Sequence, residues 1–277
     1  MERRLPPLTS LIYYLLLAAG AVVMLAPFVY MFSTSLEPHA FVLELPPRFI
    51  PAQPTLDNYV QAVTTNQFGR YFLNSMFVAV SSTIITVILS ALLAYGFARW
   101  DFPGRQFMFF SMLGTMMIPS LVLIIPQFVL AKNLHLLNSL WGLVVVYSAG
   151  TALNMFLLRG AFEDLPQDLF DSALIDGAGP FTVFLRIALP LVRPSLAAVT
   201  IFSFLGSWDE FTWALTSIND SDLRTLPIAL RLFQQQHGTE WGLVFAASII
   251  AVLPVVIIFI IFQRQFIKGV MSGALKG

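Results

Sequence analysis

The sequence contains no cysteine among its 277 residues, and only 11% of its residues are charged. The missing thiols exclude disulfide bonds, cysteine-held iron–sulfur clusters and thiol nucleophiles. Soluble domains carry about 25% charged residues, so the low charge excludes an ordinary soluble protein. The formal net charge is zero and gives no indication of a nucleic-acid partner. Apolar side chains dominate instead: they make up 57% of the chain and raise its mean hydropathy to +0.80.

Motifs for catalysis and for energy coupling are also missing. No Walker-type sequence (Gly, four residues, Gly-Lys, then Ser or Thr) occurs, so we expect this chain to be no enzyme and not to hydrolyse ATP. No Lys, Arg or His falls in the middle of an apolar stretch, although ion-coupled carriers usually keep an ionisable residue there. The histidines His39, His135 and His237 are far apart in the sequence, so we expect no metal site. Any transport would therefore take its energy from a partner.

Six apolar stretches are long enough to cross a bilayer, whose core needs about 20 apolar residues per helix. Helix is the expected state, because lipid offers no partner to backbone N–H and C=O groups. The run after the N-terminal MERRLPPLTS is too long for a signal peptide, so we interpret it as an uncleaved first span. We predict an all-α polytopic membrane protein, with residues 1–277 forming a single transmembrane domain. The predicted spans are Leu11–Phe32, Phe72–Phe97, Gln106–Ala131, Ser139–Ala161, Leu191–Leu215 and Trp241–Phe266.

The distribution of Lys and Arg predicts the orientation of these spans. Ten of the fifteen fall on the same side as the N-terminus, and positive charge marks the cytoplasmic side. Both termini are then cytoplasmic, together with the loop 163–193 and the tail 267–277, while the loop 216–240 faces outward. The tail has three glycines between Lys268 and Gly277, and we expect them to prevent a stable helix.

The loop before the fifth span is polar and rich in turn residues. From Asp168 to Leu174, apolar residues recur at helical spacing. Gly177 suits the left-handed conformation that ends a helix, and Pro180 suits the first position of the next helix. Two short helices joined at a glycine form either a docking element or an amphipathic hairpin on the lipid headgroups. The residue pattern by itself leaves both interpretations open.

The same loop carries residues at fixed intervals: Asp171-Ser172-Ala173, then Gly177, then Ile187, then Leu189-Pro190. The series resembles the loop of the inner-membrane permease subunits of bacterial ABC importers, which reads EAA, three residues, G, nine residues, I, one residue, LP. Asp171 and Ser172 depart from it, since the family has Glu and Ala there. The runs AYGFARWDFPGR and SWDEFTWAL resemble the carbohydrate branch of these permeases. The tail QFIKGVMSGALKG resembles that of the maltose-type (MalG-like) subunit.

The resemblance implies the fold of the type I ABC importer permeases, with six spans, in the bacterial inner membrane. It implies a second, different permease subunit, two ATP-binding subunits and an extracytoplasmic solute-binding protein as partners. This chain would carry no cofactor, since ATP and Mg would be held by the ATP-binding subunits. We expect Phe170, Ala173 and Leu174 to insert into a cleft on the ATPase. The full set of expected coupling residues is Phe170, Asp171, Ser172, Ala173, Leu174, Asp176, Gly177, Ile187, Leu189 and Pro190.

The chain would form half of the path for a sugar or a sugar-like polyol. Polar residues fall roughly on one face of the fourth predicted span, and they either line this path or bond neighbouring helices. By the resemblance, the outer loop would reach the binding protein. The candidate path residues are Tyr147, Thr151, Asn154, Asp209 and Glu210, and the candidate contacts to the binding protein are Gln234, Gln235 and Gln236. The alternatives are an ion-coupled secondary carrier or channel, and an ABC permease for a solute other than a sugar.

Two further expectations concern the spans themselves. Pro119 and Pro126 can each remove a helical hydrogen bond, so they are expected to bend the third span. Trp208, Trp213 and Trp241 are expected at the level of the lipid headgroups, where aromatic residues are enriched.

Overall fold

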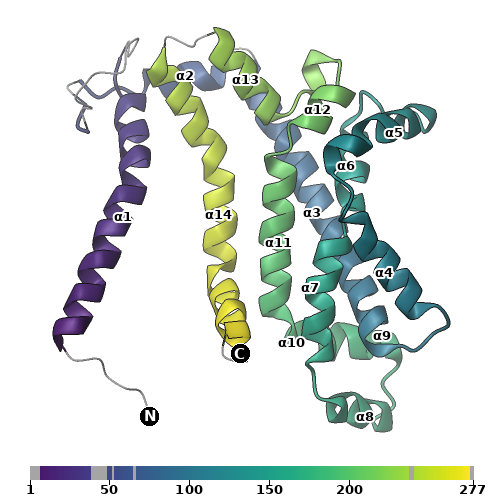
Figure 1. Ribbon diagram of the computed structural model, residues 1–277. Helices are drawn as coiled ribbons and strands as arrows, with labels where there is room; N and C mark the ends of the chain where they lie inside the picture. The colour runs from purple at the N-terminus through teal and green to yellow at the C-terminus, as the bar shows by residue number, and fades with distance from the viewer. Residues whose placement is uncertain (1–6, 39–48, 52, 65–66, 237–239, 275–277) are drawn as a thin grey trace. The chain divides into compact units, whose positions relative to one another are not determined.

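The computed structural model describes residues 7–38, 49–51, 53–64, 67–236 and 240–274, and the regular structure in them is helical. Figure 1 labels the principal helices. In chain order they are α1 (Pro7–Ser35), α2 (Asp57–Thr64), α3 (Phe68–Arg99), α4 (Arg105–Thr115), α5 (Ser120–Asn133), α6 (Leu140–Ala149), α7 (Ala152–Glu163), α8 (Gln167–Ile175), α9 (Pro180–Val183), α10 (Leu189–Leu191), α11 (Arg193–Trp208), α12 (Thr212–Ser217), α13 (Leu226–Gln236) and α14 (Trp241–Ala274).

The chain divides into two compact units, which are described one at a time. The first unit comprises Met1–Gly69 and Ala229–Val252, and the second comprises Arg70–Ile228 and Leu253–Gly277.

In the first unit, the side chain of Asn58 on α2 ties the end of α1 in place. Its Nδ2 donates to the carbonyl oxygens of Ser35, at 2.9 Å, and of Glu37, at 2.8 Å. Gly242 on α14 lies against the same site. A Cβ there would come within 2.7 Å of Asn58 Nδ2 and 2.9 Å of the Glu37 oxygen. The absence of a side chain at position 242 therefore allows three segments of this unit to meet.

In the second unit, aromatic side chains form the core near the end of α3. The Tyr95 ring lies 5.5 Å from Phe162 on α7 and 4.9 Å from Phe184, centroid to centroid. Phe184 begins a π-helical turn, Phe184–Ala188, between α9 and α10. Figure 1 shows α8 at this end of the unit, and α5 and α12 at the opposite end. The second unit thus has a densely packed aromatic base, against which α8 lies.

Within the described residues, three helices are long and apolar enough to cross a membrane: Ser10–Ser35, Phe68–Arg99 and Trp241–Gln265. They confirm the first, second and sixth predicted spans. Three bent helix pairs bring the number to as many as six, if each pair counts as one span.

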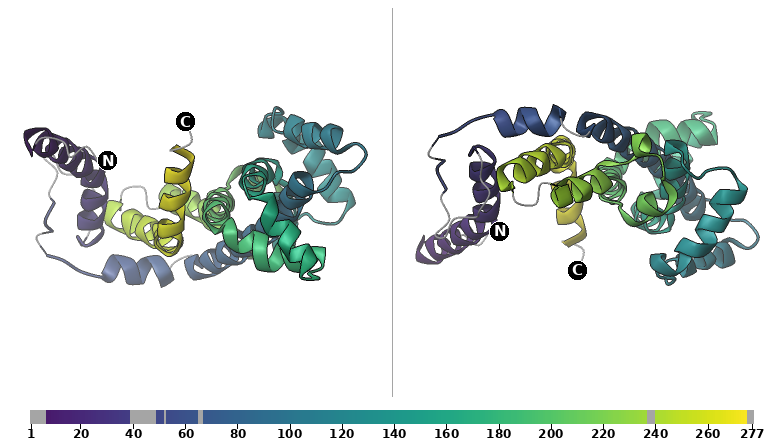
Figure 2. Two further views of the ribbon diagram at one scale, coloured as in Figure 1. Left: turned by 90° about the horizontal axis from the view of Figure 1, so that it is seen from below. Right: turned by 90° about the horizontal axis from the view of Figure 1, so that it is seen from above.

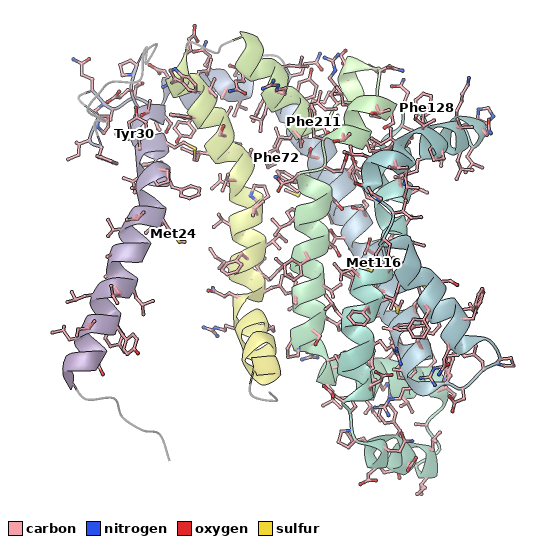
Figure 3. All side chains as sticks on the ribbon, in the orientation of Figure 1. Met24, Tyr30, Phe72, Met116, Phe128 and Phe211 are labelled. Carbon is pink, nitrogen blue, oxygen red and sulfur yellow. The ribbon has the colours of Figure 1, made fainter. Side chains whose placement is uncertain are left out.

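The third predicted span, Gln106–Ala131, is not a straight helix. Helices α4 and α5 meet at 103°, and Met116, labelled in Figure 3, lies at the bend. Pro119 immediately precedes α5 with an extended backbone, ψ 131°, because proline cannot continue the hydrogen bonding of α4. Pro126 lies inside α5 without ending it. In both views of Figure 2, α4 and α5, in teal, lie at the edge of this unit.

The fourth and fifth predicted spans are also broken. Helices α6 and α7 meet at 47° around Gly150, and the segment Pro180–Leu191 meets α11 at 81°. Helix α11 ends at Trp208, well before the predicted end at Leu215. Phe211, labelled in Figure 3, lies between α11 and α12. Hydropathy predicts how much chain can enter a membrane, but it carries no information about these breaks.

Two of the tryptophans do not lie where we expected them. Trp208 and Trp213 are buried inside the chain, so the expectation that they face the headgroups is wrong. Trp208 stacks on Phe204, with centroids 5.6 Å apart, and meets Phe72 edge-on at 5.8 Å. Packing against these aromatic rings takes the place of contact with lipid. Trp241 is partly exposed.

The expectation that the tail is not helical is also wrong. Helix α14 continues through Gly269 and Gly273 and ends at Ala274. A glycine costs about 1 kcal/mol in a helix interior, and a helix that is already long does not need to be nucleated again. Extension of α14 therefore tolerates both residues.

Candidate functional site

The loop 163–193 consists of short helices around a glycine turn. Helix α8 ends at Ile175, Gly177 has φ 78°, and Pro180 begins α9. The N–H of Gly177 donates to the carbonyl of Leu174, and that of Ala178 donates to the carbonyl of Ala173, at 2.9 Å. These bonds satisfy carbonyls that a helix end leaves without partners. The geometry is the one predicted from the spacing of glycine and proline.

Arg99, the last residue of α3, fixes the start of α8. Its Nη2 donates to the carbonyl oxygens of Phe162, at 2.6 Å, and Leu165, at 2.7 Å, at the end of α7. Its Nη1 donates to Gln167 Oε1 at 3.1 Å. The guanidinium carbon lies 3.9 Å from the centroid of the Phe170 ring, close enough for a cation–π interaction. One side chain thus connects α3, the end of α7 and α8.

The apolar residues of α8 divide into a buried pair and an exposed pair, so the expectation that Phe170 and Ala173 insert into the ATPase is wrong. Phe170 is 5% exposed, and Ala173 is also buried, both within the aromatic base of their own chain. They are therefore not available to insert into a partner. Leu174 is exposed, and Ile175 is 87% exposed. Amphipathic spacing cannot distinguish a face that packs on its own chain from one that awaits a partner, so only the contacts separate these residues.

The remaining expected coupling residues form two groups. Asp171, Ser172 and Asp176 are exposed on α8 or at its end, and Asp171 Oδ1 accepts a hydrogen bond from Gln167 Nε2 at 3.0 Å. The other three residues are partly buried and belong to the turn that leads to α11. They are Ile187, Leu189 and Pro190.

A cavity of about 310 Å³ lies among α3, α6, α7 and α11, and it is called the polar cavity for the polar side chains that stand among the apolar ones in its wall. It brings together three of the five candidate path residues, Tyr147, Asn154 and Glu210. Hydroxyl groups that the sequence analysis did not single out also line it, at Thr86, Ser203 and Ser207. Serines are ordinary in membrane helices, so no sequence signal marks these in advance.

Within this cavity, Glu210 is held by three donors. The Tyr147 hydroxyl donates to Oε2 at 2.6 Å. The backbone N–H groups of Trp213 and Ala214 donate to Oε1 at 2.8 Å and to Oε2 at 3.1 Å. The carboxylate therefore satisfies the first turn of α12 and fixes the break after α11.

The cavity offers mainly uncharged hydrogen-bonding groups. Asn154 Nδ2 donates to Ser203 Oγ at 3.0 Å, which links α7 to α11, and Ser82 Oγ donates to Ser207 Oγ at 2.9 Å. Thr151 is buried and does not line the cavity, and Asp209 is exposed outside it. Donors and acceptors without net charge suit the hydroxyl groups of a polyol.

At the other end of the second unit, two asparagines hold the segment 217–226. Asn138 Oδ1 accepts from the backbone N–H groups of Asn219, at 3.1 Å, and Asp220, at 2.8 Å. Asn74 Nδ2 donates to the backbone carbonyls of Asp222 and Arg224, both at 2.9 Å. The segment is therefore fixed from both sides.

The described part of the predicted outer loop 216–240 is largely helical, because it contains the end of α12, a 3-10 turn at Ser221–Leu223 and α13. Gln234 on α13 is exposed. The side chains of Gln235 and Gln236, and residues 237–239 with His237, lie outside the described residues, as does His39. Among the residues that the structure describes, no group of three or more His, Asp or Glu is arranged to hold a metal ion.

Comparison with known sequences places these features in context. Residues 86–272 match the family described as binding-protein-dependent transport system inner membrane component. The chain is 35% identical over 268 residues to the diacetylchitobiose uptake system permease protein NgcG of Streptomyces coelicolor, which covers 96% of this chain and 88% of the relative. It is 32% identical over 280 residues to the arabinooligosaccharides transport system permease protein AraQ of Halalkalibacterium halodurans, over the full length of both. It is 35% identical to the trehalose/maltose transport system permease protein MalG of Thermococcus litoralis, covering 95% of this chain and 97% of the relative.

A solved structure shares the fold. A chain from a bacterial ABC transporter involved in the import of the acidic polysaccharide alginate aligns with a TM-score of 0.80 at 23% identity, covering 94% of this chain and 96% of the other. Another structure, of the bacterial alginate ABC transporter in complex with a periplasmic protein bound to an alginate pentasaccharide, aligns with a TM-score of 0.67 at 15% identity, covering 92% and 93%. At these identities the likeness shows the fold.

Proposed function

Since this chain belongs to the family of binding-protein-dependent transport system inner membrane components, we propose that α8 docks an ATP-binding subunit and that the polar cavity is part of an oligosaccharide path. The complete importer would contain a second, different permease subunit and two ATP-binding subunits that hold ATP and Mg. A solute-binding protein outside the bacterial inner membrane would deliver the sugar. This chain would serve as a non-catalytic subunit.

The observation that carries the docking proposal is the pair of apolar side chains at the end of α8. Leu174 and Ile175 are exposed, while Arg99 and the aromatic base hold the helix that bears them. Exposed apolar residues on a fixed element suit a contact with another protein or with lipid, and the resemblance of the loop to the coupling loop of ABC permeases favours the protein. Helix α8 also lies at the end of the second unit in Figure 1, where a subunit at the membrane surface has access.

The sugar proposal depends on the chemistry of the cavity and on the relatives. The relatives named above are permeases for diacetylchitobiose, arabinooligosaccharides and trehalose or maltose. The cavity offers Tyr147, Asn154 and serine hydroxyls, which can exchange hydrogen bonds with a neutral glycan. These features favour a neutral oligosaccharide over a non-sugar solute.

Glu210 bears on the alternative of an ion-coupled carrier, because it is an ionisable residue in the cavity. A coupling carboxylate must be able to release and bind its ion during transport. The three hydrogen bonds to Glu210 instead engage both of its oxygens in holding α12. We therefore assign it a structural part and keep ATP as the energy source.

The docking proposal is tested by crosslinking, which the absence of cysteine makes direct. Ile175→Cys should crosslink to a single-cysteine ATP-binding subunit in the assembled transporter. The matched control is Leu215→Cys, an exposed apolar position on α12, which should not crosslink. Equal crosslinking at both positions, or none at position 175, contradicts docking through α8.

The path is tested by transport in vesicles that contain the whole importer. Gly206→Trp places a large side chain in the cavity, where a Cβ meets nothing within 4 Å, and it should block uptake while Ile175→Cys still crosslinks. Uptake should also stop when ATP is withheld with ion gradients intact. Continued uptake without ATP supports the ion-coupled alternative and overturns the proposal.

A further inference from the structure

A second cavity, of about 480 Å³, lies where α3 ends and α4 begins. It belongs to the second unit and is separate from the polar cavity, with which it shares no lining residue. The turn between the two helices, the first turn of α4 and Arg159 on α7 form its wall. None of the residues proposed for the sugar path or for docking lines it.

Two guanidinium groups line this cavity. Arg105 donates from Nε, at 2.8 Å, and from Nη2 to the Phe97 carbonyl, and from Nη1 to the Asp101 carboxylate. Arg159 lies over the Phe109 ring, 4.1 Å from its centroid, and pairs with Glu163 at 2.6 Å. Each of these bonds uses only part of a guanidinium, which has five N–H donors. Both groups therefore retain donors for an anionic oxygen.

The first turn of α4 adds backbone donors to the same wall. Gly104, with φ 80°, precedes α4, and no side chain caps the helix. The N–H of Arg105 donates to the Phe102 carbonyl, while those of Gln106 and Phe107 have no partner within the helix and favour a negative group. With two guanidinium groups beside it, the wall is suited to a phosphate.

The surroundings of the cavity are apolar and exposed, as lipid-facing residues are. Phe107 is 78% exposed and Phe110 is 64% exposed, and both line the cavity. The cavity follows directly on α3, which is long and apolar enough to span a membrane. The end of such a helix lies at the headgroup level, where Arg and aromatic residues gather. The occupant that these surroundings favour is a lipid.

A carboxylate at the rim distinguishes among headgroups. The Asp101 side chain is 97% exposed, and its partner in the structure is Arg105. A purely anionic headgroup would bring a second negative charge to the one that Arg105 already balances, and would offer Asp101 no partner of its own. A headgroup that carries both a phosphate and a primary ammonium offers a partner to the guanidinium groups and to Asp101 together.

We propose that this cavity binds the headgroup of a zwitterionic aminophospholipid, of the phosphatidylethanolamine class. Arg105, Arg159 and the start of α4 hold the phosphate, and Asp101 accepts from the ammonium. The acyl chains lie along Phe107 and Phe110. The site anchors the turn between α3 and α4 at the membrane surface and is independent of the sugar carried.

The test counts lipids that stay bound to the assembled transporter. The complex is placed in nanodiscs with equal amounts of phosphatidylethanolamine, phosphatidylglycerol and phosphatidylcholine, and the lipids retained after release are identified by native mass spectrometry. Wild type should retain phosphatidylethanolamine preferentially. Asp101→Asn should reduce that preference about three- to fivefold, as expected for an exposed ion pair, and should not affect folding because the side chain is exposed.

Further arms separate this proposal from its alternatives. Arg105→Gln should lower retention of all phosphate headgroups, whereas Asp57→Asn, an exposed carboxylate on α2 outside the cavity, should change nothing. Soluble glycerophosphoethanolamine at millimolar concentration should fail to displace the lipid, because the acyl chains also contact the protein, and displacement would contradict a lipid as the occupant. Preferential retention of phosphatidylglycerol, or an unchanged phosphatidylethanolamine preference in Asp101→Asn, overturns the proposal.

Discussion

The guanidinium of Arg99, at the end of α3, lies over the ring of Phe170 on α8, with its central carbon 3.9 Å from the ring centroid. The last residue of a membrane-spanning helix thereby covers the inward face of the helix that we propose to dock an ATPase. The same guanidinium donates to two backbone carbonyls at the end of α7. One side chain therefore connects α8 to α3 and to the end of α7.

We expect Arg99→Gln and Arg99→Lys to loosen α8. Lysine keeps the charge but lacks the planar fork that reaches two carbonyls while covering a ring. Either substitution leaves the partly buried carbonyls of Phe162 and Leu165 without their donor. This loss should lower the free energy of unfolding by about 2 kcal/mol. Amide hydrogen exchange in α8 should accelerate in both variants, and stimulation of ATPase activity by the loaded binding protein should fall several-fold. Arg231→Gln, at an exposed position on α13, is the control. Exchange at the wild-type rate in Arg99→Lys would show that charge alone is sufficient.

Phe170 and Ile175 should respond to truncation in opposite ways. Phe170→Ala removes a buried ring and should destabilise the chain by about 3–5 kcal/mol. Ile175→Ala changes an exposed side chain, so it should leave stability unchanged and weaken retention of the ATP-binding subunit. Thermal unfolding in detergent and co-purification measure the two effects. If Ile175→Ala unfolds the chain, or if Phe170→Ala leaves its stability intact, the assignment of the two faces is wrong.

Gly177 should tolerate a side chain only at a conformational cost. A Cβ at this position meets nothing within 4 Å, but the backbone has φ 78°. Gly177→Ala should therefore cost about 1–2 kcal/mol, from the left-handed conformation alone, and Gly177→Asn should cost less. Gly179→Ala is the matched control, because Gly179 has φ −69° and also has open space. Equal unfolding midpoints for the two alanine variants would contradict this account.

Gly142 and Gly160 allow a similar comparison, in which the space around the residue, and not its backbone conformation, decides the effect of a side chain. A Cβ at Gly142 would overlap the backbone carbonyl of Leu136, whereas a Cβ at Gly160 meets nothing within 4 Å. We expect Gly142→Ala to destabilise the chain strongly, because backbone cannot move aside easily. Gly160→Ala, inside α7, should stabilise it by about 0.5–1 kcal/mol. The two unfolding midpoints should therefore move in opposite directions, and a stable Gly142→Ala variant would refute the predicted overlap.

Local rules were sufficient where one segment decides its own structure. Hydropathy predicted α1, α3 and most of α14, and the spacing of Gly177 and Pro180 predicted the turn after α8. The residues of the loop also indicated the family before any comparison. In each case, residues close together in the sequence determine the structure, through their hydropathy or their preference for a turn.

The parts that could not be predicted depend on contacts between distant segments. The break after Trp208 is held by Tyr147, which lies more than sixty residues earlier in the chain. Phe170 and Ile175 are both apolar and both on α8, and only the contacts with Arg99 and the aromatic base decide which of them is covered. The polar cavity likewise draws serines from separate helices, and no local pattern links those residues.

The two asparagines that hold the segment 217–226 recognise it through its backbone. Asn138 accepts hydrogen bonds from backbone N–H groups, and Asn74 donates hydrogen bonds to backbone carbonyls. Neither of these sets of bonds depends on which side chains the segment carries. Asn219 and Ser221 are exposed on it, and their replacement leaves these hydrogen bonds in place. The exposed positions of this segment can therefore be replaced one by one while its backbone stays in place, so sequence variation there is separated from the stability of the fold.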